Sequence, residues 1–284
     1  MNYKPLILGI GEIVWDCLPE GKKLGGAPVN FAYHAMQLGA ESYPVSAVGS
    51  DSLGDETIQA CGSYGLDTRF IQVNDLPTSR VLVSLDAKGV PAYEIVENVA
   101  WDALKAAPEA MALASRADAV CWGSLAQRSA SSRKAVLQLL SAVPSDALKV
   151  FDINLRQHYY SKEVIETSLQ QANVLKLNED ELPVVLSLLG ASDVAELISL
   201  YHLEYLVFTC GDAYSEVYGP DGLLSHMETP AVQVADTVGA GDCFTAAFVM
   251  NILKGETPFH AHQEAVRLSA WLCTLPGAIN PHVL

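Results

Sequence analysis

Long apolar runs, basic residues and paired cysteines are all scarce in this sequence of 284 residues. Half of the residues are hydrophobic, yet none of the runs reaches the roughly 18 uncharged apolar residues that a membrane-spanning helix needs. Only 17 Lys and Arg stand against 33 Asp and Glu, so the formal charge is −16. Because this charge repels a polyanion and no basic stripe overrides it, we do not expect nucleic acid as a partner. The lack of a spanning run argues against a membrane as a partner.

The six cysteines show no C-x-x-C pair. They lie at positions 17, 61, 121, 210, 243 and 273, several of them in apolar surroundings, which is typical of reduced core thiols. The opening Met-Asn-Tyr-Lys-Pro leads straight into a strand-like run rather than a signal peptide. We therefore expect a cytoplasmic protein. His260 and His262 are two apart and diverge on a helix, which argues against a metal site there.

Strand-like apolar runs alternate with longer helix-like segments. We expect strands at residues 6–10, 43–48, 119–122, 150–153, 174–177 and 205–209, and a helix at 28–38 that stops at Gly39. This order is typical of an α/β fold with a central, mostly parallel sheet flanked by helices. Polar motifs follow the strands, where open sheets of this type bind ligands. No repeat or linker marks a second domain, so residues 1–284 are expected to form one.

One stretch breaks this alternation. Residues 80–86 and 91–97 read as two strands joined by a short turn at 87–89, with no helix between them. Such a pattern predicts an antiparallel hairpin, which would form a flap beside the parallel sheet.

The most informative segment is the loop at residues 236–242, Asp-Thr-Val-Gly-Ala-Gly-Asp. The small residues Gly239, Ala240 and Gly241 let an anion approach the backbone amides. From Asp242 to position 254 no Gly or Pro interrupts a predicted buried helix. Free amides and the positive helix end would stabilise phosphoryl charge, and Asp242 could take the proton from an attacking hydroxyl.

Two other interpretations of this loop stay open on local grounds. An Asp behind a tight glycine turn is a common helix N-cap, which needs no chemistry. The run also partly imitates a dinucleotide fingerprint, but Phe244 occupies the place of the third glycine, and Gly9-Ile-Gly11 lacks its third glycine too. A nicotinamide-dependent oxidoreductase is therefore disfavoured.

A series of motifs resembles the ribokinase-like (PfkB) family of carbohydrate kinases across nearly the whole chain. The matching runs, in the order of the family, are residues 25–30 (Gly-Gly-Ala-Pro-Val-Asn), 48–54, 152–156, 178–181, 209–211 and 236–242. An ordered series is more specific than any single motif. The resemblance implies the ribokinase-like fold, with a small β lid over the sugar that residues of about 12–24 and 79–98 would supply.

The resemblance assigns a sugar site to the amino-terminal motif. In the family the glycine pair and the Asn, here Gly25, Gly26 and Asn30, hold sugar hydroxyls together with an Asp, here Asp16, and the catalytic Asp242. Short polar groups suit this task because Asn both donates and accepts hydrogen bonds. A glycine turn before a proline also starts helices routinely, so the local alternative is purely structural.

The segment at 152–156 carries three polar side chains at alternate positions. We expect Asp152, Asn154 and Arg156 to extend a strand and to project to one side of it. A solvated strand end is the plain alternative. The resemblance implies that Asn154 and Arg156 reach the nucleotide phosphates, where Arg offers a fixed fork of donors.

Asn178 and Glu181 have two explanations that are compatible. Asn followed by Glu three residues later is a capping box at a helix start. In the family the same Asn-x-x-Glu motif organises Mg²⁺ and its waters near the phosphates, which suits the preference of this ion for a few carboxylates plus water.

Further nucleotide contacts follow from the resemblance alone. It carries Thr209, Gly211, Asp236 and Thr237 over to the nucleotide site. Family members usually have another glycine where this chain has Tyr214, so packing around the nucleotide is expected to differ.

The resemblance thus implies an ATP-dependent sugar kinase that requires Mg²⁺ and phosphorylates a primary hydroxyl. Residues 121–129, 152–157 and 176–182 most resemble those of bacterial fructokinases, which makes fructose the first choice of acceptor. Ribose, 2-keto-3-deoxygluconate and a nucleoside stay open as acceptors, as do activation by a monovalent cation and a homodimer through the lid. A non-catalytic sugar sensor is the alternative from another class.

Overall fold

The computed structural model describes residues 4–18, 21–85 and 91–282. Within them, nine strands form one large sheet in the order β13-β12-β11-β10-β9-β8-β1-β4-β5. Its strands are β1 (Leu6–Ile10), β4 (Glu41–Gly49), β5 (Ile71–Asn74), β8 (Ala119–Trp122), β9 (Leu148–Asp152), β10 (Val174–Asn178), β11 (Tyr205–Cys210), β12 (Tyr214–Gly219) and β13 (Gly222–Glu228). Neighbours from β11 to β5 pair in parallel, and the antiparallel pairings of this sheet are those of β12 with β11 and with β13. The predicted mostly parallel sheet is therefore confirmed.

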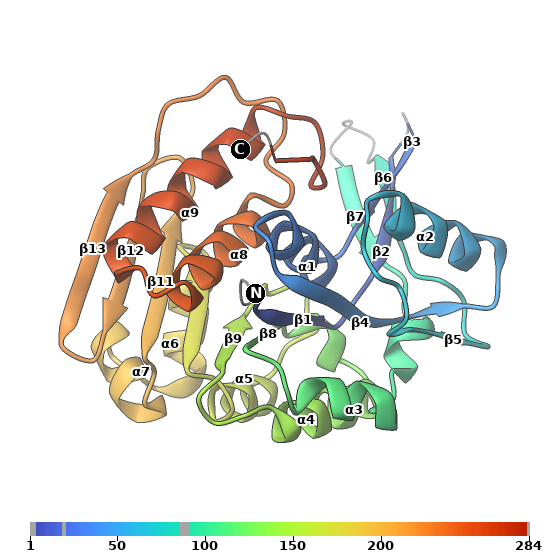
Figure 1. Cartoon of the computed structure of the whole chain (residues 1–284), viewed down its shortest axis with the longest axis horizontal. Coiled ribbons are helices and arrows are strands. Elements are labelled where there is room, and N and C mark those ends of the chain that lie inside the picture. Colours follow the sequence, from blue (N-terminus) through green and yellow to red (C-terminus); the bar gives the residue numbers. More distant parts are fainter. Residues whose placement is uncertain (1–3, 19–20, 86–90, 283–284) are drawn as a thin grey trace.

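Helices cover both faces of this sheet (Figure 1). On one face lie α1 (Ala27–Gln37), α8 (Ala240–Leu253) and α9 (Pro258–Cys273). On the other face lie α3 (Pro108–Ala114), α4 (Ala130–Ala142), α5 (Lys162–Leu169), α6 (Glu181–Leu189) and α7 (Val194–Tyr201). The α2 helix (Ser52–Ser63) lies near β4 and β5, and the short 3₁₀ turns η1 (Ala100–Ala103) and η2 (Leu125–Gln127) complete the set.

Side-chain alternation along the strands builds a separate core on each face. In β1, Leu6, Leu8 and Ile10 join the core under α3 and α4, whereas Ile7 joins the core with residues of α1 and α8. Successive strand residues point to opposite faces, so a strand covered on both sides is apolar throughout. This explains why the parallel strands appear in the sequence as short continuous apolar runs.

The predicted positions of the elements agree closely with the observed ones. The strands expected at 6–10 and 119–122 are β1 and β8 at those bounds, and the helix expected at 28–38 is α1. The other four predicted strands correspond to β4, β9, β10 and β11, with ends that differ by one or two residues.

A second, four-stranded sheet stands beside the large one, in the order β3-β2-β6-β7 (Figure 1). The predicted hairpin is present as β6 (Arg80–Leu85) and β7 (Pro91–Ile95), which pair antiparallel. The turn predicted at 87–89 lies outside the described residues. The other two strands of this sheet are β2 (Val14–Leu18) and β3 (Gly21–Gly25). Strand β2 pairs with β6 in parallel, and β3 pairs with β2 in antiparallel.

No single helix among the described residues has the length and apolar composition to cross a bilayer. Helices α6 and α7 meet those criteria only when taken together, with a bend of 56° between them.

The packing of α8 against α9 and the sheet gives a stability prediction. Phe248 is 1% exposed and stacks edge-on against Tyr205 with ring centroids 5.6 Å apart. We expect Phe248→Ala to lower the free energy of unfolding by about 3–5 kcal/mol in urea denaturation, because the site cannot collapse around the lost ring. Phe259 in α9 is 50% exposed, so Phe259→Ala should change it by less than about 0.5 kcal/mol. Equal losses in the two variants would contradict this packing.

Candidate active site

Asn30 and Asp242 meet where the amino ends of α1 and α8 approach each other. Nδ2 of Asn30 donates a hydrogen bond of 2.8 Å to Oδ2 of Asp242, across 212 residues of sequence. Asn30 is buried, and Asp242 is partly buried. The structure thus joins the two strongest motifs of the sequence in one side-chain contact.

The glycine loop lies directly before α8, which begins at Ala240. Gly239 has φ of 79°, and a Cβ there would lie 2.5 Å from the Cβ of Ala278, so this position requires glycine. Because the helix begins before Asp242, this carboxylate is not the N-cap, and the purely structural interpretation fails for it. Its position in the first turn aims it at Asn30 instead.

Most amides of this loop and helix start have no acceptor among the described residues. The amide of Ala240 donates to the carbonyl of Thr237 at 3.2 Å. No hydrogen bond engages the amides of Gly239, Gly241 or Asp242 in the described part of the chain. Free amides at the positive end of a helix form a site suited to an anion.

The Asp242 carboxyl titrates near neutrality. Burial and the negative charge of Asp152 raise its pKa to about 7, against the opposing influence of Asn30, Lys176 and Arg156. A carboxyl with a pKa close to the working pH is well matched to general-base catalysis.

Lys176 is a site residue that the sequence analysis did not assign. It projects from β10 (Val174–Asn178), and its Nζ lies 3.1 Å from Oδ1 of Asp152, with both side chains almost fully buried. Its Nζ is also 3.0 Å from where a Cβ on Gly241 would lie. Burial alone would lower the pKa of Lys176, but the charges of Asp152, Glu181 and Asp242 outweigh it and raise that pKa. A permanent cation therefore lies against the glycine loop.

A signal for Lys176 was present in the sequence. It is a single charged residue within the apolar strand Val-Leu-Lys-Leu-Asn, and charged side chains are rarely buried without a partner. The partner, Asp152, also lies 3.1 Å from Oγ1 of Thr245 in α8. Asp152 therefore connects β9, β10 and α8 beneath the loop.

The expectation of a strand extending through residues 152–156 was wrong. The β9 strand ends at Asp152, and Asn154 has φ of 42°, a left-handed conformation that breaks an extended chain. Next to it, the amide of Leu155 donates to Oε1 of Glu181 at 2.8 Å. Asp152 is thus a buried ion-pair partner. Arg156 is exposed, and its charge only partly offsets the rise that burial causes in the pKa of Asp16 and Asp242.

Asn178 and Glu181 form the predicted capping arrangement. Oδ1 of Asn178 accepts from the amides of Asp180 and Glu181 at 3.0 Å each, and Oε2 of Glu181 accepts from the amide of Asn178 at 2.9 Å. The Glu181 carboxylate also receives the amide of Leu155. It therefore connects the segment after β9 to the start of α6.

The amino-terminal motif supplies a second group of polar atoms. Gly26 has φ of 118°, and a Cβ there would lie 2.5 Å from the carbonyl oxygen of Glu12. Asp16, on β2, is partly buried, and burial raises the pKa of its carboxyl against the opposing charges of Arg156 and Lys23. A Cβ on Gly25 would lie 3.3 Å from Oδ2 of Asp16. The glycine pair thus lets the chain pass close to two carboxylate-bearing residues.

Two buried acceptors in this region have no partner among the described residues. They are Oδ1 of Asn30 and Oε2 of Glu12. Glu12 was not assigned by sequence, although a carboxylate between Ile10-Gly and Ile13 is an anomaly in an apolar run. Unsatisfied buried oxygens are costly, and hydroxyl groups of a bound molecule would satisfy them.

A cavity of about 710 Å³ adjoins the glycine loop, and Ala240, Gly241 and Lys176 line it. The predicted residues Asn178, Thr209, Gly211 and Thr237 border it, together with Tyr214. Asp236 does not line it. Instead, its carboxylate accepts from the amides of Val238 and Gly277 at 3.1 and 2.9 Å, and it pairs with Lys23 at 3.2 Å. Asp236 therefore shapes the loop rather than facing the cavity.

The fold and this site define a sugar kinase of the ribokinase fold. The chain belongs to the pfkB family of carbohydrate kinases, whose family profile matches residues 16–283. It is 29% identical over 272 residues to a fructokinase of Salmonella typhimurium, covering 91% of this chain and 87% of that protein. It is 28% identical over 274 residues to a putative sugar kinase of Pyrococcus horikoshii, covering 88% and 83%.

Solved structures agree with this assignment of the fold. An uncharacterized sugar kinase of Pyrococcus horikoshii in complex with ATP matches with a TM-score of 0.82 at 26% identity, over 96% of this chain and 93% of that one. A fructokinase of Xylella fastidiosa with bound ATP matches with a TM-score of 0.84 at 22% identity, over 98% and 94%.

The raised pKa of Asp242 predicts a pH-dependent stability. An unfolded Asp has a pKa of about 3.9, so between pH 4 and 7 the folded state holds the extra proton, and this stabilisation is lost as the pH rises to 7. As the pH rises from 5 to 8, the free energy of unfolding of the wild type should therefore fall relative to that of Asp242→Asn. The expected change in this difference is on the order of 1–3 kcal/mol after discounting solvent exposure. Urea denaturation at both pH values measures it.

Asp236→Asn is the matched control, because hydrogen bonds from Val238 and Gly277 outweigh burial and lower the pKa of Asp236. The ionised Asp236 stabilises the protein above pH 4, so Asp236→Asn should lower the free energy of unfolding by the same amount at every pH between 5 and 8. A flat difference for Asp242→Asn over the same range would disprove the raised pKa.

Proposed function

We propose that this protein transfers the γ-phosphoryl group of ATP to a primary hydroxyl of a free sugar, with fructose as the first candidate. The observation that carries the proposal is the contact between Asn30 and Asp242 at the amino end of α8. It places a carboxyl that titrates near neutrality beside unengaged amides and the buried Lys176 cation. These are the parts that phosphoryl transfer needs.

The proposed reaction proceeds by in-line displacement. The carboxylate of Asp242 takes the proton of the sugar hydroxyl, and that oxygen forms a bond to the γ-phosphorus. The bond from this phosphorus to the oxygen bridging the β- and γ-phosphates breaks, and ADP leaves. The amides predicted to stabilise the moving charge are those of Gly239, Ala240 and Gly241. Since the amide of Ala240 already donates to Thr237, its neighbours are better placed.

The nucleotide would occupy the cavity bordered by Thr209, Gly211 and Thr237. The relatives from Pyrococcus and Xylella were solved with ATP, which supports this use of the cavity. Asn154 and Arg156 are proposed to reach the phosphates from the end of β9. Asp236 would contribute by holding the loop in place.

Mg²⁺ fits the Asn178 and Glu181 region through water. Each oxygen of Glu181 accepts a hydrogen bond from one backbone amide. Each therefore keeps a lone pair that can accept from a water ligand of Mg²⁺, whereas direct coordination of the ion would compete with the amide. When bound, the ion would neutralise charge on the phosphates. A putative ribokinase II of Escherichia coli was solved with ATP and Mg²⁺, and a fructokinase of Vibrio cholerae with a potassium ion, so a monovalent cation is proposed as well.

The sugar would bind between Asp16, the Gly25-Gly26 pair and Asn30. The unpaired oxygens of Asn30 and Glu12 can accept from its hydroxyl groups. Fructose is favoured because the Salmonella relative is a fructokinase. Ribose, 2-keto-3-deoxygluconate and nucleosides are the alternatives within the family, and a non-catalytic sensor is the alternative outside catalysis.

The four-stranded sheet is proposed as a lid over the sugar and as a surface for a homodimer. It is built by the two segments that the resemblance assigned to the lid, and β2 carries Asp16. Closure of such a lid excludes water, which competes as phosphoryl acceptor. A cytoplasmic location is also proposed, since all six cysteines are free thiols.

Asp242→Asn tests the catalytic assignment. We expect kcat to fall by at least ~10²-fold, the lower end for a positioned general base, while sugar binding persists. Coupled ADP release with free hexoses, pentoses, nucleosides and sugar phosphates measures it. In the wild type, kcat/KM should fall as the pH drops below about 7, because Asp242 becomes protonated.

An unchanged kcat in Asp242→Asn would remove Asp242 from the mechanism. Sugar binding without turnover for any acceptor would favour the sensor. If another sugar gave the highest kcat/KM, that sugar would replace fructose as the proposed acceptor, and the proposed kinase activity would stand.

Lys176→Met tests the electrostatic role of the buried cation. We expect kcat to fall by more than ~10-fold, since a fixed charge near the moving phosphoryl is lost, with partial recovery in Lys176→Arg. Lys149→Met, on the neighbouring β9 strand but outside the site, is the control. Steady-state kinetics with varied ATP would contradict this role if Lys176→Met and Lys149→Met behaved alike.

A further inference from the structure

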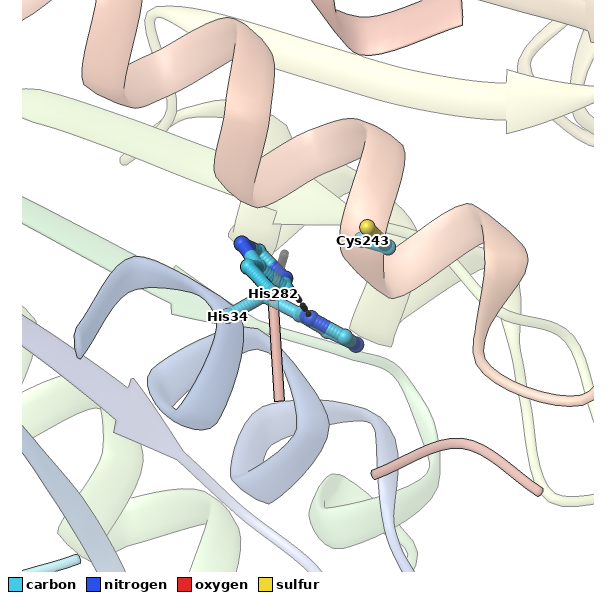
Figure 2. Close-up of side chains that lie close together, drawn as sticks. All are labelled: His34, Cys243 and His282. Atoms are coloured by element: carbon cyan, nitrogen blue, oxygen red, sulfur yellow. Dashed lines mark hydrogen bonds between the residues drawn. The ribbon is translucent and has the colours of Figure 1, made fainter. Parts of the chain in front are cut away.

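A cluster of two histidines and one cysteine lies beside the candidate active site. Figure 2 shows His34 of α1 and His282 of the carboxyl-terminal segment in contact, with Cys243 of α8 close by. One nitrogen or sulfur atom from each lies within 4.8 Å of the others. His34 and Cys243 are fully buried, and His282 is partly buried. The proposed transfer reaction uses none of these three side chains.

The hydrogen bonds of His34 leave one of its nitrogens available. Its Nε2 lies 2.9 Å from the carbonyl oxygen of Ala278, and a carbonyl can only accept, so Nε2 carries the hydrogen. In a neutral ring with the hydrogen on Nε2, Nδ1 holds a lone pair, which here accepts the hydrogen bond from Nε2 of His282. A ring N–H bonded to a backbone carbonyl is the arrangement that orients metal-binding histidines.

His282 completes the cluster with an adaptable ring. Its Nε2 donates to Nδ1 of His34 at 2.8 Å (Figure 2). Its Nδ1 is buried without a partner among the described residues. Transfer of the His282 proton from Nε2 to Nδ1 would turn Nε2 into a second lone pair beside that of His34. After this transfer, a turn of the His282 ring out of line with Nδ1 of His34 would direct both lone pairs to one point.

The distances are close to those of a tetrahedral metal centre. Bonds of about 2.05 Å to nitrogen and 2.3 Å to sulfur imply separations of about 3.3 Å between nitrogens and about 3.5 Å from nitrogen to sulfur. The nitrogens now stand 2.8 Å apart, and no pair of ligand atoms exceeds 4.8 Å. His34 and Cys243 belong to the packed helices α1 and α8, whereas His282 lies in the segment after α9. The His282 ring is therefore the one that would move on binding.

We propose that His34 Nδ1, Cys243 Sγ and His282 Nε2 bind one Zn²⁺ ion, with water as the fourth ligand. Imidazole and thiolate donors suit zinc, whereas Mg²⁺ and K⁺ prefer oxygen. On binding, the zinc–sulfur bond forms as the thiol releases its proton to solvent, and no oxidation occurs.

Zinc at this position would fix the carboxyl-terminal segment to both helices of the active site. Ala278 lies against Gly239, and the amide of Gly277 donates to Asp236 of the glycine loop. The ion would therefore stabilise the fold around the loop.

Zinc binding can be measured without any activity assay, so its outcome is independent of the kinase proposal. Metal-free protein is titrated with Zn²⁺ against a chromophoric chelator, and with Co²⁺ to detect a thiolate-to-metal charge-transfer band. We expect one ion per chain, a cobalt–thiolate band and a raised Tm. His282→Ala and Cys243→Ala should weaken zinc affinity by more than the roughly 10–100-fold that loss of an outer-shell partner costs.

Matched controls are Cys61→Ala, a fully buried cysteine in α2, and His260→Ala, an exposed histidine in α9. Both should keep the affinity of the wild type. Binding that survives in His282→Ala, or a stoichiometry below one ion per chain, would overturn the site. If Cys243→Ala does not fold, His282→Ala still decides, because its side chain lies in the terminal segment.

Discussion

The hydrogen bond between Asn30 and Asp242 is the constraint on which the candidate site depends. It holds together the amino ends of α1 and α8, two helices on the same face of the sheet. Beneath it, the ion pair of Lys176 and Asp152 ties β10 to β9, and Thr245 extends that connection to α8. Removing one member of such a buried pair leaves an uncompensated charge. The polar site is therefore also part of the structural core.

The same arrangement explains how one carboxyl can act as a base at neutral pH. Burial and the neighbouring Asp152 oppose the charge of Asp242, while Asn30, Lys176 and Arg156 favour it. The balance gives a pKa of about 7, so a modest change at any of these groups would shift it across the physiological range. Lys176 thus has two effects, since its charge acts on Asp242 and on any anion at the glycine loop.

Sequence alone predicted the mostly parallel sheet, the helix at 28–38 and the helix after the glycine loop, because buried parallel strands and glycine turns leave strong local patterns. It placed β1 and β8 at their observed bounds. It failed after β9, where the left-handed Asn154 ends the strand, since Asn is compatible with both conformations. It also missed Lys176, whose role arises from its contact with Asp152 on the neighbouring strand, and Glu12, whose buried Oε2 has no partner among the described residues. The His34, Cys243 and His282 cluster was likewise invisible, because tertiary packing alone brings these residues together.

A crystal structure with fructose and a non-hydrolysable ATP analogue tests the central claim most directly. The account predicts a primary hydroxyl of the sugar about 2.6–3.2 Å from the Asp242 carboxylate. It also predicts the terminal phosphate at the free amides of Gly239 and Gly241, on the side of Lys176. A terminal phosphate bound elsewhere, or a sugar whose hydroxyl groups do not reach Asp242, would contradict it.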